Sequence, residues 1–167
     1  MPQYVVDTSL FIQAQRQYYA RDIAPGFWSK LVELQKSGIL ISVDKVLEEI
    51  NGYYDPTDPL GDWAGNICPA EMFDATANPQ IAAYYSTLVD WIENNPLYRP
   101  AALAEFAKGA DGWVIAYALE NDCTVVSMEV SAPLSEKSAK IPDICGAFKV
   151  DHIDTFDLMR AEWISLV

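Results

Sequence analysis

Four acidic residues border short apolar runs in a pattern that could support metal-dependent chemistry. Asp7 comes directly after the run YVV, and Glu129 closely follows the run CTVVS. Asp111 lies at the start of a predicted helix, and Glu49 lies in the run VDKVLEEI. Ligand sets made only of oxygen select hard cations such as Mg²⁺ or Mn²⁺ over zinc or copper. These residue types therefore predict a divalent-cation site, and two ions held about 4 Å apart would suit phosphoryl chemistry.

The elements that must position these acids alternate between strand and helix. Short β-branched runs predict strands at 4–7, 39–42, 123–127 and 148–153. Apolar residues at helical spacing predict helices at 27–37, 43–50, 79–94, 100–108, 110–121, 141–148 and 155–163. This alternation predicts an α/β fold with three layers, α/β/α, around a central parallel sheet of about four or five strands. We expect one domain over residues 1–167, with its site at the carboxyl ends of the strands.

Two segments have less direct interpretations. The segment 53–63 is rich in Pro, Asp and Gly, which predicts a loop that could cover or gate the site. The helix at 79–94 carries an aromatic face that includes Tyr85. We assign that face to the core and not to base stacking.

Each acid also has an ordinary structural explanation. Asp7 and Asp111 are of a type favoured at helix starts, where carboxylates accept hydrogen bonds from free N–H groups. Glu129 could be a solvated residue at a strand end, and Glu48 is an alternative to Glu49 in the same helix. The hydroxyl residues nearby are cap or turn formers, with hydrogen bonding to a metal-binding carboxylate as the other role: Thr8, Ser9 and Ser127.

The composition limits the classes of protein and of site. The 24 acidic and 11 basic residues give a net charge of -13, the opposite of the basic surface typical of nucleic-acid binders. A solvated surface explains most of this charge, while bound cations or a basic partner would explain the rest. The three cysteines lack C-x-x-C spacing and are expected to be core thiols, and His152 is the only histidine. With no secretory leader and no run long enough to cross a bilayer, we expect a cytoplasmic protein.

Four segments resemble the signature blocks of PIN-domain nucleases, in the same order and across nearly the whole chain: YVVDTSLFI, VLEEI, ADGWVIAYALENDCTVVS and SMEV. By position, the resemblance implies that the metal-binding acids are Asp7, Glu49, Asp111 and Glu129, with Glu48 as the alternative to Glu49. Glu129 stands where the family commonly has aspartate. This difference keeps the charge and lengthens the side chain.

The C-terminal part extends the resemblance. Asp143 lies where related chains often carry another polar or acidic residue, so a contact with a second metal or a metal-bound water is an open option. The segment KIPDICGAFKVDHIDTFDLM resembles prokaryotic, toxin-like PIN proteins of the VapC type. That resemblance implies a toxin of a toxin-antitoxin pair, whose partner is a small basic antitoxin. A homodimer is left open.

The predicted function is therefore hydrolysis of RNA phosphodiester bonds by a metal-dependent ribonuclease. Candidate phosphate contacts are Lys108, Arg16 and Arg21. A non-catalytic PIN-like scaffold or regulatory binding module is the alternative, and the acidic surface would suit it. A receiver or phosphatase-like protein would need a second acid beside Asp7 or two residues after it, but Ser9 occupies the latter position.

Overall fold

The computed structural model describes residues 2–52, 55 and 57–167. Its centre is a five-stranded sheet in the order β3-β2-β1-β4-β5, in which every pair of neighbouring strands is parallel. The strands are β1 (Tyr4–Val6), β2 (Leu40–Val43), β3 (Phe73–Asp74), β4 (Thr124–Val126) and β5 (His152–Ile153). The expected α/β fold with a parallel sheet of about four or five strands is confirmed.

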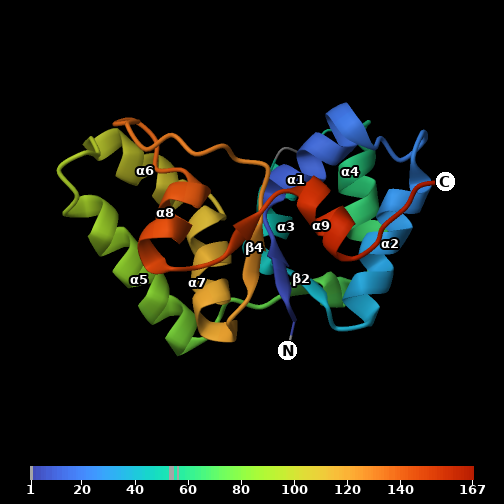
Figure 1. Ribbon diagram of the computed structural model, residues 1–167, viewed down its shortest axis with the longest axis horizontal. Coiled ribbons are helices and arrows are strands. Elements are labelled where there is room, and N and C mark those ends of the chain that lie inside the picture. The colour runs from blue at the N-terminus through green and yellow to red at the C-terminus, as the bar shows by residue number, and fades with distance from the viewer. Residues whose placement is uncertain (1, 53–54, 56) are drawn as a thin grey trace.

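Helices cover both faces of this sheet (Figure 1). One side holds α5 (Pro79–Glu93), α6 (Pro100–Lys108), α7 (Asp111–Asn121) and α8 (Ile141–Phe148). The other holds α1 (Thr8–Gln13), α2 (Pro25–Lys36), α3 (Asp44–Gly52), α4 (Pro59–Asp62) and α9 (Thr155–Ala161). Wider helical turns at Ala14–Tyr18 and Trp63–Ile67 extend α1 and α4, and a 3-10 turn spans Ala70–Met72. The arrangement is the expected three-layer α/β/α sandwich.

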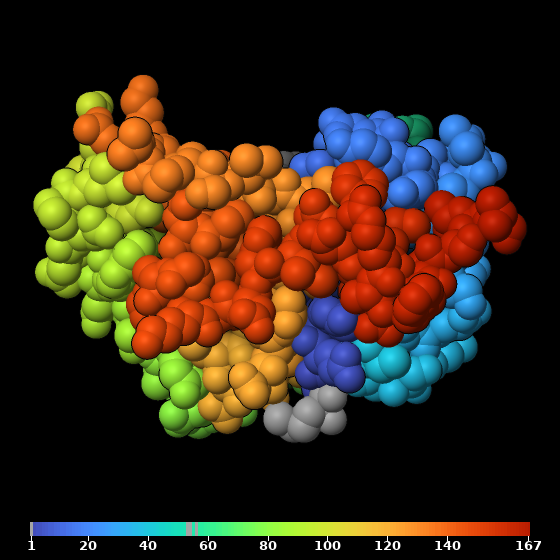
Figure 2. All heavy atoms as spheres, in the orientation of Figure 1, coloured from blue at the N-terminus to red at the C-terminus, as the bar shows by residue number. Residues whose placement is uncertain are grey.

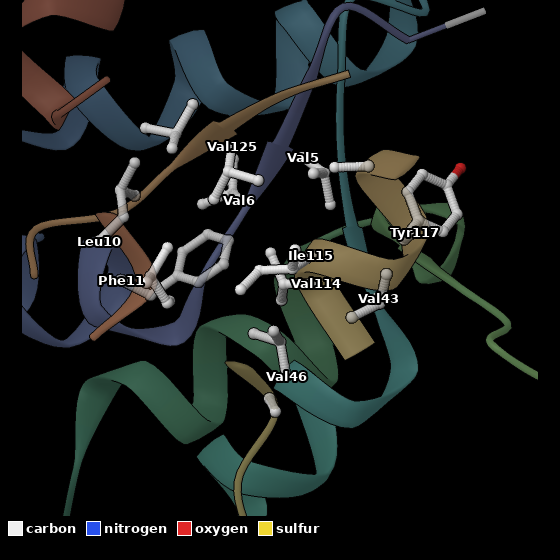
Figure 3. Packing of buried hydrophobic residues seen from close by; sticks show 14 of the residues in the cluster. Val5, Val6, Leu10, Phe11, Val43, Val46, Val114, Ile115, Tyr117 and Val125 are labelled. Atoms are coloured by element: carbon white, nitrogen blue, oxygen red, sulfur yellow. The ribbon is translucent and has the colours of Figure 1, made fainter. Parts of the chain in front are cut away.

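The core forms where α7 crosses the sheet. Val5 and Val6 of β1 are fully buried, because the central strand is covered on both faces. Val114 and Ile115 of α7 are also fully buried (Figure 3). Burial of each such side chain contributes about 1.5–3 kcal/mol to folding. This packing fixes the first turn of α7 against the ends of the central strands.

The chain order creates a switch point beside β1. The chain runs from β1 outward through β2 to β3, then returns to β4 on the other side of β1 and continues to β5. Ligand sites of doubly wound sheets form outside the carboxyl ends of the strands at such a reversal. The carboxyl ends of β1 and β4 therefore mark the expected place of the site.

Three details differ from the sequence-based expectation. Strand β3 was not predicted, and the predicted strand 148–153 is extended only at His152–Ile153. Part of the predicted loop 53–63 is helical from Pro59 onward, because the Asp58 side chain caps α4 and Trp63 becomes buried. The part of that loop prediction on residues 53, 54 and 56 lies outside the described residues.

The burial of the cysteines agrees with the expectation made from the sequence. All three cysteines are free and buried, and burial raises the pKa of the Cys145 thiol to about 12. They are unreactive core thiols. Among the residues described, no helix is both long and apolar enough to cross a bilayer.

Candidate active site

Asp7 occupies the end of β1 and caps α1. It is almost fully buried, and its Oδ2 accepts hydrogen bonds from the Ser9 amide at 3.2 Å, the Ser9 hydroxyl at 2.7 Å and the Ser127 hydroxyl at 3.1 Å. Its other oxygen, Oδ1, is buried and has no hydrogen-bond partner among the described residues. An unpaired buried carboxylate oxygen is costly, so this atom is suited to an external ligand.

The two serine hydroxyls connect Asp7 to the segment after β4. Ser9 Oγ accepts a hydrogen bond from the Met128 amide at 2.9 Å, and Ser127 Oγ accepts one from the Glu129 amide at 3.1 Å. The two hydroxyls lie 3.1 Å apart. Ser9 and Ser127 thus bond a site carboxylate, which is one of the two roles left open by the sequence, and they fix the backbone that carries Glu129.

Glu49 enters the site from α3. Its Oε2 accepts a hydrogen bond from the Ala110 amide at 2.8 Å, directly before Asp111. Burial, together with the negative charge of Asp7, raises the pKa of Glu49, and the Ala110 hydrogen bond opposes this. Glu48 is exposed and pairs with Lys45 at 2.9 Å. Of the two glutamates, Glu49 is the one beside the other acids.

Asp111 starts α7 between the other acids. Burial is the largest cause that raises its pKa, from an ordinary 3.8 to about 9, and the charges of Asp7, Glu129 and Glu49 add to it. Lys140 acts in the opposite direction. A carboxylate raises the pKa of another carboxylate in this way only when the two are close. Asp7, Glu129 and Glu49 therefore all lie near enough to Asp111 to affect its protonation.

Glu129 approaches Asp111 from the segment after β4. Its Oε2 accepts a hydrogen bond from the Ile141 amide at the start of α8, at 2.7 Å. Burial raises its pKa, the negative charge of Asp7 adds to that rise, and the Ile141 bond opposes it. The longer glutamate side chain therefore spans the gap to α8 in this structure.

Three of these acids, Glu49, Asp111 and Glu129, line a cleft at the carboxyl edge of the sheet, while Asp7 is buried and absent from its lining. We call Asp7, Glu49, Asp111 and Glu129 together the acid edge. The cleft has a volume of about 620 Å³, and the residues that line it are Glu49, Ala101, Ala104, Glu105, Lys108, Gly109, Asp111 and Glu129. In Figure 2 the upper outline of the molecule dips between the orange segment that follows β4 and the blue helical segment that follows β1.

The chemistry of the acid edge fits a hard divalent cation. It offers only carboxylate oxygens, one of which is the unpaired Asp7 Oδ1, and the charges of the other three acids raise the pKa of Asp111. In the part of the chain that the structure describes, no three His, Cys, Asp or Glu side chains are arranged to hold one ion. Glu49 and Glu129 are instead bonded to backbone amides. These bonds use only Oε2 of each glutamate, so ligation of one ion by three acids would require the side chains to move closer together, with Oε1 still available.

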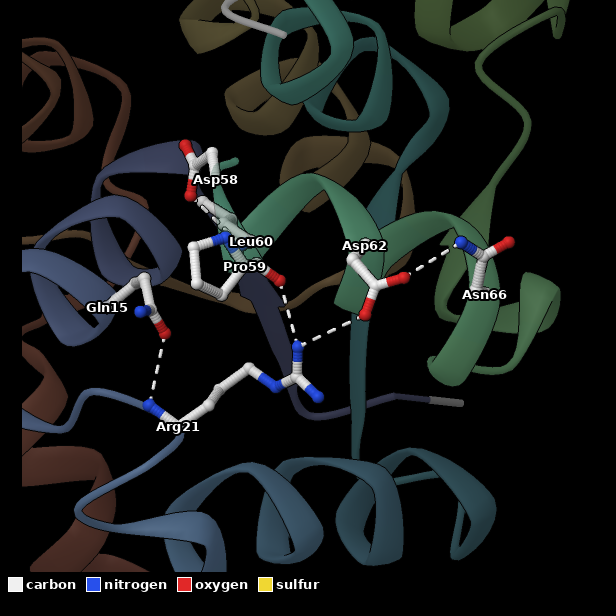
Figure 4. Close-up of polar contacts among 7 residues, drawn as sticks. All are labelled: Gln15, Arg21, Asp58, Pro59, Leu60, Asp62 and Asn66. Atoms are coloured by element: carbon white, nitrogen blue, oxygen red, sulfur yellow. Dashed lines mark hydrogen bonds and ion pairs between the residues drawn. The ribbon is translucent and has the colours of Figure 1, made fainter. Parts of the chain in front are cut away.

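The basic residues divide between this cleft and a separate structural cluster. Lys108 lines the cleft, which is where a residue predicted to contact phosphate should lie. Arg21, however, donates from Nη1 to the Pro59 carbonyl at 2.9 Å and lies 3.7 Å from Asp62 (Figure 4). Arg16 lies 3.8 Å from Asp58. These arginines therefore hold the start of α4, and they do not line the cleft.

Two further residues complete the account of the site. Asp143 accepts hydrogen bonds from the Ser131 hydroxyl and the Ala132 amide, so both of its oxygens anchor the segment after β4. Lys140, which sequence reasoning missed, lies close enough to Asp111 and Glu129 for its positive charge to oppose the rise in the pKa of both. The only signal for it in the sequence is its position directly before the Ile-Pro pair that starts α8.

The fold and the site define an α/β protein with a doubly wound parallel sheet and a carboxylate cluster at its switch point. The chain belongs to the family described as domain of unknown function DUF4411, which matches residues 4–166. The matched region includes the whole acid edge. No curated protein matches the chain.

Proposed function

We propose that this protein is a divalent-metal-dependent endoribonuclease that hydrolyses RNA phosphodiester bonds. The observation that carries the proposal is the acid edge: the buried Asp7 and three partly buried carboxylates lie at a switch point, and Asp7 Oδ1 has no partner among the described residues. Such an excess of negative charge is stabilised when cations bind to it. The resemblance to PIN-domain nucleases supplies the reaction and the substrate class.

In this proposal each acid has a defined part. Asp7, Glu49, Asp111 and Glu129 would hold Mg²⁺ or Mn²⁺, two ions in all. The bound cations supply charge neutralisation and a lowered pKa for the attacking water. Ser9 and Ser127 orient Asp7, and the Ala110 and Ile141 amides position the two glutamates before the cation binds. Lys108 and Lys140 offer positive charge to the substrate phosphates.

The biological setting belongs to the same proposal. The resemblance to toxin-like PIN proteins supports a cytoplasmic toxin that is paired with a small basic antitoxin. The net charge of -13 would favour a basic protein partner. A homodimer is compatible with this setting.

One observation favours a second candidate, a non-catalytic PIN-like scaffold or regulatory binding module. Glu49 and Glu129 are already hydrogen-bonded to backbone amides, so the site holds together without a cation. In a scaffold, the role of the two glutamates would be structural: each would hold a helix start in place through its amide. The two candidates therefore differ in whether a divalent cation binds and supports turnover.

The test is a cleavage assay on mixed-sequence single-stranded RNA with Mg²⁺, Mn²⁺ or a chelator. We expect cleavage by the wild type with either metal, none in chelator, and a loss of at least about 100-fold in Asp7→Asn and Asp111→Asn, because even residues that only support metal ligands contribute 10–100-fold. Asp62→Asn, an exposed acid of the Arg21 region, is the matched control and should cleave normally. Thermal unfolding should show that Mg²⁺ stabilises the wild type but not Asp111→Asn. Equal cleavage by all four proteins, or no metal effect on either measurement, would exclude the nuclease and favour the scaffold.

A further inference from the structure

A second groove joins the acidic cleft and contains aromatic and basic side chains. Its volume is about 570 Å³, and the described residues that line it are Lys45, Glu48, Glu49, Gly52, Tyr85, Ala107, Lys108, Gly109, Ala110 and Trp113. We call it the aromatic groove. It shares Glu49, Lys108 and Gly109 with the acidic cleft, so a chain that leaves the acid edge along this side enters it directly.

Trp113 is the central side chain of this groove. Buried residues make up most of α7 after its first residue, but Asp111 and Trp113, both in its first turn, are only partly buried. The two residues are about 3 Å apart along the helix axis. One therefore contributes to the acidic cleft and the other to the aromatic groove, from the same rigid turn.

The ring of Trp113 is held by stacking on Tyr85, and the residue as a whole remains partly exposed. Tyr85 stacks on it with 4.1 Å between ring centroids and 10° between ring planes. Gly112 makes this possible, because a β-carbon there would lie 2.7 Å from the Tyr85 ring. Trp113 also lines a further hollow of about 480 Å³ beside Thr76–Pro79, which continues the path. A fixed, partly exposed indole is a suitable platform for a nucleobase.

The cations of the groove are placed for a phosphate backbone. Lys108 lies where the groove and the acidic cleft meet, and it makes no ion pair with any described residue. The Lys45 ammonium lies over the Trp113 ring, 5.9 Å from its centre, so this flexible side chain would have to move aside for a base to stack on that face. Its only ion-pair partner among described residues is the exposed Glu48. An exposed pair of this kind is worth little, so a phosphate can replace Glu48.

We propose that the aromatic groove binds the single-stranded RNA that flanks the scissile phosphate, with one base stacked on Trp113 and the backbone phosphates near Lys108 and Lys45. The inference rests on the proposed nuclease function and specifies its substrate class. Duplex RNA keeps its bases stacked on one another and cannot offer one to Trp113, so the groove selects single strands. Tyr85 packs on the core as expected, but it also supports this platform.

The test measures the anisotropy of a labelled oligouridylate in chelator, where binding is separated from cleavage, and the KM and kcat with Mg²⁺. Trp113→Leu should weaken binding by about fivefold or more, the loss typical of one stacked base, while Trp113→Phe should bind nearly as the wild type does. Trp91→Leu is the matched control, because Trp91 also lies in an aromatic cluster, with Tyr98 and Phe148, and is absent from the residues lining the groove. Binding to the wild type should quench tryptophan fluorescence, and Trp113→Phe should lose that quenching.

The outcomes separate this inference from the proposed function. A higher KM with unchanged kcat in Trp113→Leu supports both. If the binding pattern holds but no protein cleaves RNA, the groove stands and the nuclease fails. If cleavage is normal and Trp113→Leu keeps the wild-type affinity and KM, the groove is overturned while the nuclease stands. Equal weakening by Trp91→Leu and Trp113→Leu, or no binding by the wild type, also overturns the groove.

Discussion

The acid edge and the cluster around Arg21 use the same carboxylate side chains in opposite ways. Around Arg21, the acids Asp58 and Asp62 lie near guanidinium groups or cap α4 (Figure 4). At the acid edge, the Asp7 carboxylate accepts hydrogen bonds from Ser9 and Ser127 at one oxygen, and its other oxygen has no partner among described residues. Charges are balanced in the first region and left in excess in the second.

This difference indicates which region carries function. Exposed ion pairs contribute little to stability and are easily replaced. Buried carboxylates without cations cost free energy, and a protein tolerates that cost where a ligand offsets it. The pKa of Asp111, raised to about 9, is the clearest sign of that cost. The comparison therefore predicts that removal of a carboxylate charge from the acid edge raises the free energy of unfolding. Removal of one from the Arg21 cluster should leave that free energy nearly unchanged.

The largest effect is expected from Asp111→Asn in chelator. Below about pH 4, Asp111 is protonated in both the folded and the unfolded chain, so the variant and the wild type differ least. As the pH rises, the unfolded chain releases this proton while the folded chain keeps it up to about pH 9, and the wild type loses stability throughout this window. At about pH 8, roughly four units above the ordinary pKa of 3.8, the variant should be more stable by several kcal/mol, since each unit corresponds to about 1.4 kcal/mol.

Urea unfolding over a pH series measures this difference. Asp62→Asn is the control, because its carboxylate is exposed and paired, and its stability should follow the wild-type pH curve. Parallel pH curves for wild type and Asp111→Asn would show that the acid edge carries no excess charge, and the contrast between the two regions would be lost.

A smaller loss is expected from Ser127→Ala. The Ser127 hydroxyl is fully buried, donates to Asp7 and accepts from the Glu129 amide. Its removal leaves that partly buried amide and a buried oxygen of Asp7 each short of one partner, which should lower the free energy of unfolding by about 1–2 kcal/mol in urea titrations. Ser131→Ala removes an exposed hydroxyl bond to Asp143 and should cost less than about 0.5 kcal/mol. Equal losses in the two variants would mean that the buried serine is not a support of the acid edge.

The strands that form the acid edge could be predicted because their sequences are strongly patterned. YVV and TVV are short runs rich in β-branched residues; YVV precedes a helix start and TVV follows the end of a helix. The switch-point rule then brings Asp7 and Glu129 to the same edge of the sheet. Strand β3 has only two residues, Phe73 and Asp74, and no periodicity can mark so short a strand. Helix α4 was not predicted, because its segment is rich in residues that favour loops. The burial of Trp63 stabilises the helical conformation despite that preference.

The details of the site depend on contacts that leave no pattern in the sequence. Glu48 and Glu49 are adjacent on α3, and only the packing of α3 against the rest of the fold decides which one reaches Ala110. The Ala110 and Ile141 amides that bind the two glutamates are backbone groups, which every non-proline residue has. Lys140 was missed for the same reason, since its role depends on where α8 starts.

The smallest effect is expected from Arg21→Met, which tests the balanced region. Methionine keeps much of the side-chain stem and removes the charge, the bond to the Pro59 carbonyl and the 3.7 Å pair with Asp62. Because such pairs are partly exposed, the free energy of unfolding should fall by at most about 1 kcal/mol, less so in high salt. RNA cleavage should stay within about twofold of the wild type, since Arg21 is absent from the residues lining the acidic cleft. A loss of cleavage of about tenfold or more at unchanged stability would mean that Arg21 contacts the substrate, and the Arg21 cluster would then belong to the functional surface with the acid edge.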